Sequence, residues 1–155
     1  MKVVYGNLFT LAQSGKFDVI IHGCNCFNTM GKGVALGIKH NFPEAYHADQ
    51  KTKKGDLSKL GNITFGRHTL RGDGKTQLII VNGYTQYRYG IEYRKADYDA
   101  IRSVFRIVKK QFSGKRILYP RIGVGCAGGK WGIISKIIDE ELAGEDHTLV
   151  IFHGG

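Results

Sequence analysis

The chain lacks most of the features that would place it in a specialised class of protein. None of its apolar runs approaches the roughly 18 residues that a membrane-spanning helix needs. Its first residues, MKVVYG, turn polar too soon for a secretory signal peptide. No Gly/Ser tract or linker divides the 155 residues. We therefore expect a single domain over residues 1–155 that has no membrane partner and is cytoplasmic.

Metal-binding and disulfide patterns are absent as well. The three cysteines, Cys24, Cys26 and Cys126, are an odd number in a sequence without a secretory signal, so we expect reduced thiols. Their spacing is not that of a zinc finger and no fourth ligand is evident, so we expect no metal. We interpret them as small buried side chains that line loops. The six histidines share no spacing, and no cofactor is predicted.

Two common nucleotide-binding fingerprints are also missing. No segment reads G-x-x-x-x-G-K-[ST], so we do not expect a nucleotide triphosphatase. No G-x-G-x-x-G motif is followed by the well-placed acidic residue of a dinucleotide-binding fold. A phosphate ligand would therefore have to be held by a loop of another kind.

What the chain has in excess is glycine and positive charge. Glycine accounts for 22 of the 155 residues, about twice its usual share of about 7%. Lys and Arg total 23 against 13 acidic residues, which gives a net charge of +10. This charge favours anionic ligands. The basic residues are scattered along the sequence, so nucleic-acid binding is an alternative that we do not favour.

Two glycine-bearing segments each follow an apolar run and precede a helical pattern. Residues 23–35 read GCNCFNTMGKGVA, and residues 123–131 read GVGCAGGKW. In such a setting, backbone N–H groups and a helix N-terminus converge beyond a strand end and can bind phosphate. Two such segments could hold a diphosphate from both sides. Each segment alone is equally consistent with a tight turn, because turns use glycine for conformational reasons.

Hydrophobic patterning predicts strands that alternate with helices. Strands are predicted at residues 2–5, 17–22, 63–66, 78–82, 116–119 and 148–152. Helices are predicted at residues 33–40, from Pro43 onward, at 94–112 and at 131–142, and residues 51–62 are predicted to form a polar surface loop. This alternation is typical of an α/β fold with three layers, helix, sheet and helix.

Three motifs, taken in order, resemble those of macrodomains. They are YGNLF at residues 5–9, Asn25 followed by GKGVA at residues 31–35, and PRIGVG at residues 120–125 ahead of a helix that begins with Trp. The resemblance extends over residues 2–152. It is closest to the branch that processes ADP-ribose 1''-phosphate and to the related ADP-ribosyl hydrolases. It implies a mixed, roughly six-stranded sheet and, as partner, ADP-ribose, a derivative of it or an ADP-ribosylated macromolecule.

The resemblance also implies a set of ligand-binding residues. Asn7 would meet the adenine in place of the usual Asp, Asn25 would hold the distal ribose, and Phe152 or His153 would pack against the adenine. The implied ligand-binding residues are Asn7, Leu8, Asn25, Gly31, Gly33, Val34, Ala35, Gly123, Val124, Gly125, Cys126, Ala127 and Phe152. A turn residue is the alternative for Asn7, and a core aromatic is the alternative for Phe152.

Two positions depart from the pattern of the family's hydrolases. Several branches carry a Lys after the strand predicted at residues 78–82, where this chain has Gln86, and an Asp in the second glycine segment, where it has Ala127. A Gln side chain cannot form a Schiff base with the ribose. The lysine mechanism and a carboxylate general base from the second segment are therefore not expected.

Asn25 and His22 remain as the predicted catalytic residues. His22 is a candidate general base if its ring reaches a bound water, and a core residue if it faces inward. Lys32 or Lys130 could neutralise a terminal phosphate. A phosphatase without an acid can still act by positioning and electrostatics.

The favoured function is therefore an ADP-ribose-binding macrodomain that hydrolyses the terminal phosphate of ADP-ribose 1''-phosphate. Three alternatives stay open. The first is an ADP-ribosyl ester hydrolase, which would act on a modified macromolecule or on O-acetyl-ADP-ribose. The second is a non-catalytic ADP-ribose reader, and the third is a basic RNA-binding domain.

Overall fold

The computed structural model describes residues 1–89 and 96–152, apart from the side chain of Cys126, and these residues build one six-stranded sheet. Its strands are β1 (Lys2–Gly6), β2 (Val19–Cys24), β3 (Ile63–Thr69), β4 (Gln77–Tyr84), β5 (Ile117–Tyr119) and β6 (His147–Phe152). They lie in the order β1-β6-β5-β2-β4-β3. Neighbouring strands are parallel except for β3, which pairs antiparallel with β4. The predicted mixed six-stranded sheet is confirmed.

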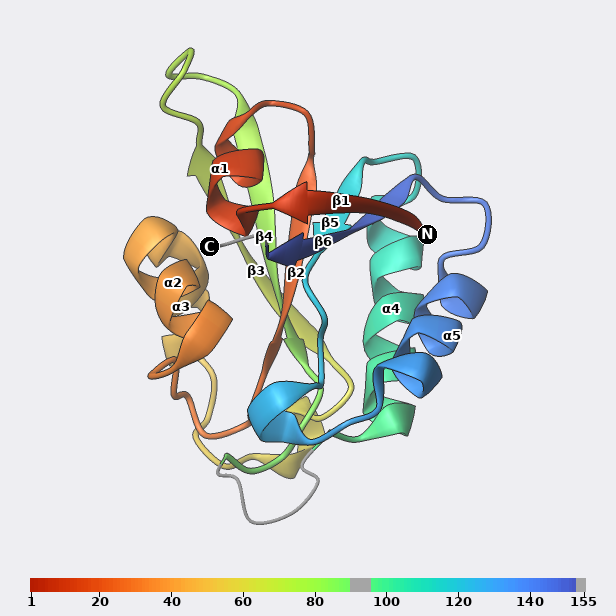
Figure 1. Cartoon of the computed structure of the whole chain (residues 1–155). Helices are drawn as coiled ribbons and strands as arrows, with labels where there is room; N and C mark the ends of the chain where they lie inside the picture. The colour runs from red at the N-terminus through yellow and green to blue at the C-terminus, as the bar shows by residue number, and fades with distance from the viewer. Residues whose placement is uncertain (90–95, 153–155) are drawn as a thin grey trace.

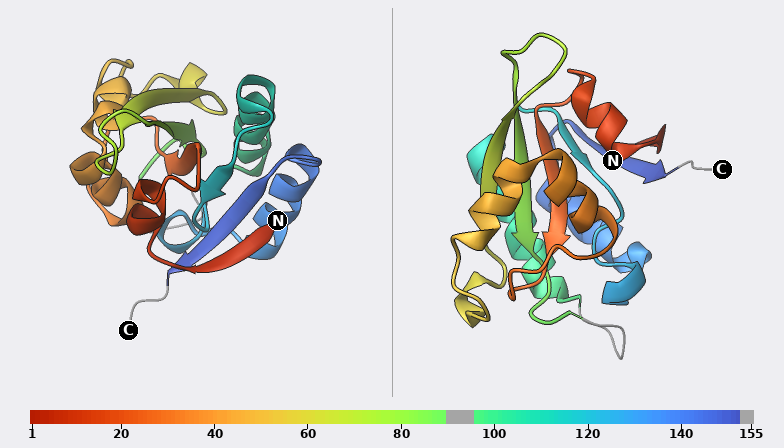
Figure 2. Two further views of the ribbon diagram at one scale, coloured as in Figure 1. Left: turned by 90° about the horizontal axis from the view of Figure 1, so that it is seen from above. Right: turned by 90° about the vertical axis from the view of Figure 1, so that its left-hand side faces the viewer.

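Helices cover both faces of the sheet, as Figure 1 and Figure 2 show. The helices α1 (Leu8–Gln13), α2 (Gly33–Asn41) and α3 (Pro43–Gln50) lie on one face, and α4 (Tyr98–Phe112) and α5 (Trp131–Glu141) lie on the other. Within residues 1–89 and 96–152, none of the helices is long and apolar enough to cross a membrane.

The central strands are apolar on both sides because each face of the sheet carries a helical layer. Val19 and Ile21 of β2 pack against the layer of α4 and α5, whereas Ile20 between them packs against the layer of α1, α2 and α3. Successive side chains of a strand point to opposite faces. A strand covered on both faces therefore reads as a nearly continuous run of Val, Ile and Leu, which is why the sequence pattern located the buried strands β2, β4, β5 and β6.

The predicted elements agree with the structure to within a few residues. The strands differ from the prediction by no more than three residues at either end. The helices predicted at residues 33–40, from Pro43 and at 131–142 are present. The helix predicted at residues 94–112 begins only at Tyr98, because the Asp97 side chain accepts a hydrogen bond from the Ala100 N–H and caps the helix there. Residues 94–95 lie outside the described residues.

Two features of the fold were not predicted. The six-residue helix α1 is too short for a helical period to be visible, although the Asn7 side chain that caps it is a start signal. The segment predicted as a polar surface loop, residues 51–62, contains the 3-10 helix η1 (Leu57–Lys59), and the Lys59 side chain is buried. The prediction was wrong for Lys59 because hydrogen-bonding partners allow its charge to be buried.

The topology creates a crevice between β2 and β5. These strands are parallel neighbours, with Val19 opposite Ile117 and Ile20 opposite Leu118, so both chains leave the sheet at the same edge. The chain after β2 continues into α2 on one face, and the chain after β5 continues into α5 on the opposite face. Ligands of open α/β sheets bind where neighbouring connections diverge in this way. Both glycine segments start at this crevice.

A chain of buried polar groups runs through the sheet beneath the crevice. His22 Nε2 donates to Asn82 Oδ1 over 2.7 Å, and Asn82 Nδ2 donates to Thr64 Oγ1 over 3.0 Å. The Tyr84 hydroxyl lies 3.0 Å from Thr64 Oγ1 and donates to Asp49 Oδ1 over 2.7 Å. Each member uses its neighbour as a partner, so these buried polar groups are satisfied.

Burial keeps the His22 ring neutral. Its side chain is 1% exposed, and desolvation lowers its pKa from 6.5 to about 4, opposed by the hydrogen bond with Asn82. In the unfolded chain the same ring takes up a proton near pH 6.5. Between about pH 6.5 and pH 4, the unfolded state therefore binds a proton that the folded state does not, and stability falls as the pH falls.

We expect the His22→Gln variant to lose this part of the pH dependence. A Gln side chain can still donate to Asn82, but it does not titrate. Between pH 7 and pH 5, the wild-type free energy of unfolding should fall by about 2 kcal/mol more than that of the variant. Urea unfolding at both pH values measures this difference. Burial raises the pKa of Asp49, which acts in the opposite sense but is common to both proteins. Equal pH slopes would contradict a neutral buried His22.

Gly66 brings β3 into contact with the backbone of α3. A Cβ atom at this position would lie 2.6 Å from the carbonyl carbon of Glu44 and 2.7 Å from the Ala45 nitrogen. We expect Gly66→Ala to lower the free energy of unfolding by about 1–3 kcal/mol, because backbone cannot move aside as a flexible side chain can. Gly72→Ala is the matched control, since a Cβ there meets nothing within 4 Å. Urea unfolding of both variants checks the difference, and a Gly66→Ala protein as stable as the control would refute the contact.

Candidate functional site

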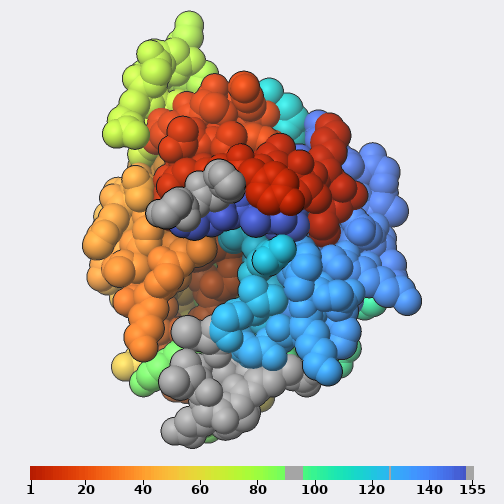
Figure 3. All heavy atoms as spheres, in the orientation of Figure 1, coloured from red at the N-terminus to blue at the C-terminus, as the bar shows by residue number. Residues whose placement is uncertain are grey.

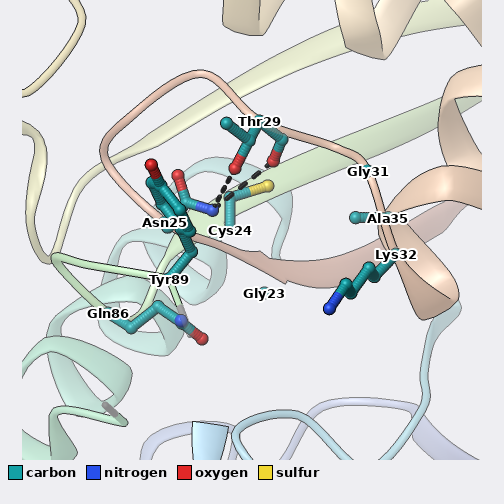
Figure 4. Close-up of a pocket in the computed structure, with 9 residues that line it drawn as sticks. All are labelled: Gly23, Cys24, Asn25, Thr29, Gly31, Lys32, Ala35, Gln86 and Tyr89. Carbon is teal, nitrogen blue, oxygen red and sulfur yellow. Dashed lines mark hydrogen bonds between the residues drawn. The ribbon is translucent and has the colours of Figure 1, made fainter. Parts of the chain in front are cut away.

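A cavity of about 390 Å³ opens at the end of β2. Its walls come from the segment between β2 and α2, from the start of α2 and from the segment after β4 (Figure 4). The residues that line it are Gly23, Cys24, Asn25, Thr29, Gly31, Lys32, Ala35, Gln86 and Tyr89. Figure 3 shows a hollow in the surface. The orange helices α2 and α3 lie on one side of it, and the blue segment that leads into α5 lies on the other.

The start of α2 presents unsatisfied backbone donors beside the cavity. Gly33 begins the helix with a positive φ of 58°, and the Lys32 side chain at the N-cap makes no capping hydrogen bond. The first N–H groups of a helix have no intrahelical acceptor and carry the positive end of the helix dipole. Because Lys32 and Ala35 line the cavity, this helix end suits an anionic group bound there.

Asn25 is held by its own loop. Its Oδ1 accepts a hydrogen bond of 2.8 Å from the Phe27 N–H, and its Nδ2 donates to Thr29 Oγ1 over 2.6 Å (Figure 4). The other contact of Nδ2, to the Thr29 carbonyl oxygen, is 3.5 Å long and therefore weak. The amide is thus fixed in position and keeps donor capacity for a ligand in the cavity.

Lys32 gives the cavity its charge. It is the single charged residue among the nine that line the cavity, and none of the nine is a carboxylate. Figure 4 shows its ammonium group extending into the cavity toward the side where Gln86 lies. A cation without a facing carboxylate attracts an anionic ligand.

The thiol in the cavity wall is not a nucleophile. Cys24 is buried, and its Sγ lies 3.6 Å from His22 Nε2. Burial raises the pKa of this thiol well above its ordinary value, with smaller contributions from Asp49 and Cys26. Burial likewise raises the pKa of Cys26. The thiolate is the reactive form of cysteine, so both side chains act as small buried groups, as predicted.

His22 does not lie where a catalytic base must lie. The ring is buried, bonded to Asn82 and held neutral, and it is not among the cavity-lining residues. This ring bonds Asn82, which in turn donates to the Ala45 carbonyl of α3, so the structure gives His22 the core role that the sequence had left open.

The second glycine segment lies beside the cavity but does not line it. The 3-10 helix η2 (Gly125–Ala127) follows β5, and Gly123, Gly125 and Gly128 all have positive φ, at 82°, 65° and 73°. The Gly129 N–H closes the turn on the Gly123 carbonyl over 2.7 Å. Successive turns of this kind point N–H groups outward and form anion-binding concavities.

Gly23 brings this second segment next to the cavity. A Cβ on Gly23 would lie 2.7 Å from Thr85 Oγ1 and 3.2 Å from Ile122 Cγ2, and Ile122 immediately precedes the second segment. Ile122, the residue before the second segment, is therefore a neighbour of Gly23 in the cavity wall. A diphosphate bound between the two segments would extend beyond the cavity along the crevice.

Asn7 and Phe152, which were predicted at the adenine, lie where the paired strands β1 and β6 end. Asn7 is exposed, and its Oδ1 accepts hydrogen bonds from the N–H groups of Phe9 and Thr10, so its amide NH₂ remains for a ligand. The Leu8 side chain is buried in the core, which leaves its backbone for a contact. Phe152 is 70% exposed and therefore not a core residue. Strand register sets it beside Gly6. His153 lies outside the described residues.

Thr29 and Tyr89 were missed by sequence reasoning. The signal for Thr29 was an Asn followed four residues later by Thr, a spacing that lets the two side chains bond across a turn. Tyr89 gave no signal, because its place depends on the path that the chain takes after β4. Among the described residues, no group of three or more His, Cys, Asp or Glu is placed to hold a metal ion.

A buried lysine, Lys59, is hydrogen bonded to the first glycine segment. Lys59 is 8% exposed, and its ammonium donates to Asn28 Oδ1 over 2.5 Å and to Thr52 Oγ1 over 2.8 Å. Asn28 lies in the segment that carries Asn25 and Thr29 and has a positive φ of 58°. Its Nδ2 also donates to the Thr52 carbonyl over 2.8 Å. The unusual backbone of the segment is thus fixed by a buried cation.

The sequence is similar to one phage protein over most of its length. It is 34% identical over 144 residues to an uncharacterised 17.5 kDa protein of enterobacteria phage T4, a match that covers 90% of this chain and 88% of the phage protein. It is 26% identical over 117 residues to the DNA ADP-ribosyl glycohydrolase of Mycobacterium tuberculosis. That match covers 74% of this chain but 32% of the mycobacterial protein, so the chain corresponds to about a third of that relative. No family model matches the chain.

Solved structures share the fold over nearly the whole chain. The macrodomain protein of Streptomyces coelicolor superposes with a TM-score of 0.73 at 22% identity, over 99% of this chain and 100% of that one. The DarTG protein of Thermosipho africanus, solved with ADP-ribose, superposes with a TM-score of 0.74 at 15% identity, over 99% of this chain and 42% of that one. Together with the sheet order described above, these likenesses show that the chain has the macrodomain fold.

Proposed function

We propose that this macrodomain binds ADP-ribose and hydrolyses the terminal phosphate of ADP-ribose 1''-phosphate. The observation that carries the proposal is the composition of the cavity wall, which combines the open N-terminus of α2 with one cation, Lys32, and no carboxylate. Such a wall favours a ligand whose end is itself anionic. A terminal phosphate has that charge.

The ligand would lie along the crevice. The distal ribose and its phosphate would occupy the cavity, next to Asn25, Gly31 and the first turn of α2. The diphosphate would contact the N–H groups of residues 123–127, and the adenine would lie between Asn7 and Phe152. The structure of Thermosipho africanus DarTG with ADP-ribose supports a nucleotide ligand for this fold.

The chemistry would rest on positioning. A water held in line would attack phosphorus, and the bond from phosphorus to the ribose 1''-oxygen would break. One proton of the water would end on the 1''-oxygen, which leaves as the hydroxyl of ADP-ribose, and the other would stay with the inorganic phosphate. Lys32 and the N–H groups of α2 would stabilise the charge on the phosphate oxygens in the transition state. Asn25 would hold the ribose so that the water is aligned.

Release of ADP-ribose from a modified macromolecule is the second candidate. It is favoured by the likeness to the mycobacterial DNA ADP-ribosyl glycohydrolase, which covers 74% of this chain. Against it stand Gln86, a cavity residue that cannot form a Schiff base, and Ala127, which offers no carboxylate. An assay for ADP-ribose release from a modified oligonucleotide distinguishes it from the phosphatase.

We expect Lys32→Met to lower kcat/KM for phosphate release from ADP-ribose 1''-phosphate by at least about tenfold, since about 1.4 kcal/mol of charge stabilisation would be lost. Asn25→Ala should lower it as strongly, because the ribose loses its anchor. Lys110→Met, a change of the same kind at an exposed site on α4, should have no effect. Colorimetric detection of phosphate measures all three. Wild-type release no faster than that of Asn25→Ala would refute the phosphatase.

We expect Lys59→Met to weaken ADP-ribose binding although Lys59 lies outside the cavity. The substitution leaves Asn28 Oδ1 and Thr52 Oγ1 without their donor, so the segment that carries Asn25 loses its support. Calorimetric titration should show a Kd raised about tenfold, and Lys59→Arg should recover part of it. Lys75→Met, in an exposed turn, is the control. An unchanged Kd in Lys59→Met would show that the segment is held without this lysine.

A further inference from the structure

The surface beside the cavity mouth combines a cluster of three aromatic rings, of which Tyr89 is exposed, with positively charged side chains. We call this surface the basic aromatic tract; its residues are Phe27, Lys51, Lys53, Lys54, Tyr87, Arg88 and Tyr89. Tyr89 belongs both to the tract and to the cavity wall. The tract therefore begins where the cavity opens.

The aromatic part of the tract is continuous. The Phe27 ring lies edge-on to Tyr87 and to Tyr89, with centroids 5.0 Å and 6.0 Å apart. The Tyr87 hydroxyl donates to the Gly55 carbonyl over 2.7 Å, which fixes the ring. Tyr89 is 62% exposed, so one large ring faces solvent at the end of the cluster. An exposed ring on a packed base is a platform on which a flat partner can stack.

The charged part of the tract lies next to these rings. Lys53 and Lys54 directly precede Gly55, whose Cβ position is 3.2 Å from the Phe27 ring, and Arg88 lies over the Tyr87 ring at 5.7 Å. The side chains of Lys51, Lys53 and Lys54 are exposed and have no hydrogen bond or ion pair within the described residues.

The nearby carboxylate does not neutralise this charge by a direct ion pair. Asp56 Oδ1 accepts hydrogen bonds from the N–H and the hydroxyl of Ser58, over 2.9 Å and 2.8 Å, and caps η1. These bonds lower the pKa of Asp56, and its carboxylate is bound to Ser58 at the start of η1. Lys53, Lys54 and Arg88 therefore lie beside the aromatic platform, and Asp56, the carboxylate that follows the two lysines in the sequence, is bonded to Ser58.

We propose that the basic aromatic tract binds single-stranded nucleic acid. The lysines would contact backbone phosphates and an unpaired base would stack on Tyr89, which is how proteins bind single strands without reading their sequence. A single strand fits better than a duplex, because a paired base presents only its edge and cannot stack on a side chain. This inference rests on the proposed binding of ADP-ribose and bears on the second candidate function, since a nucleotide modified with ADP-ribose on the bound strand could place that group in the adjacent cavity.

Binding of an unmodified oligonucleotide tests the tract without involving the cavity. We expect a fluorescein-labelled dT12 to bind the wild-type protein in an anisotropy titration, with rU12 as the RNA arm. In the double variant Lys53→Gln/Lys54→Gln, the Kd should rise at least tenfold. The slope of log K against log salt should fall in magnitude by about 1.4, because two phosphate contacts are lost. The control Lys75→Gln/Lys110→Gln removes the same charge from exposed sites elsewhere and should change the Kd less than twofold.

Three outcomes would overturn the proposal. These are no binding of either oligonucleotide, equal weakening in the control variant, and displacement by polyglutamate at the charge concentration at which poly(dT) displaces the probe. The last would indicate an acidic polypeptide as the partner.

Calorimetry with ADP-ribose separates this proposal from the proposed function, because the variant Lys53→Gln/Lys54→Gln should bind ADP-ribose normally. Asn25→Ala should lose ADP-ribose but keep the oligonucleotide. A wild-type protein that binds the oligonucleotide but not ADP-ribose would retain the tract and refute the proposed function.

Discussion

The structure depends on one constraint, the parallel pairing of β2 with β5 at the centre of the sheet. Because the two strands point the same way and their connections leave toward opposite helical layers, the backbone must part at their ends. The site is therefore a product of topology, and the residues around it determine only which ligand it accepts.

Charge and rigidity at the site come from different layers. Lys32 and the start of α2 supply the positive potential at the cavity. Beneath them, Lys59 holds Asn28, and the chain from His22 to Asp49 supports the strands below. The lower layer is buried and hydrogen bonded, so it has few ways to rearrange. A loop rich in glycine, which would otherwise be mobile, is in this way held in one conformation.

The sequence predicted the elements better than the details of the site. A run of apolar residues such as Val19–Ile21 indicates a strand that is buried on both faces. Such a run is visible within a few consecutive residues, so the buried strands could be predicted. The orientation of His22, the burial of Lys59 and the place of Tyr89 each depend on chain segments distant in sequence. No pattern within a window of residues encodes such contacts. Asn25 could be named because the residues around it resemble a macrodomain motif, and the structure places it in the cavity wall.

The glycine at the cavity floor has a consequence for how this fold changes during evolution. Gly23 lies so close to Thr85 and Ile122 that any side chain there would collide with the neighbouring strand connections. The wall positions Thr29, Lys32 and Tyr89 are free of that restriction, because they are partly or fully exposed. A side chain at Gly23 is thus excluded by its neighbours, while the exposed wall positions have room for other side chains. New substrate preferences can arise by single changes at these wall positions without a loss of folding.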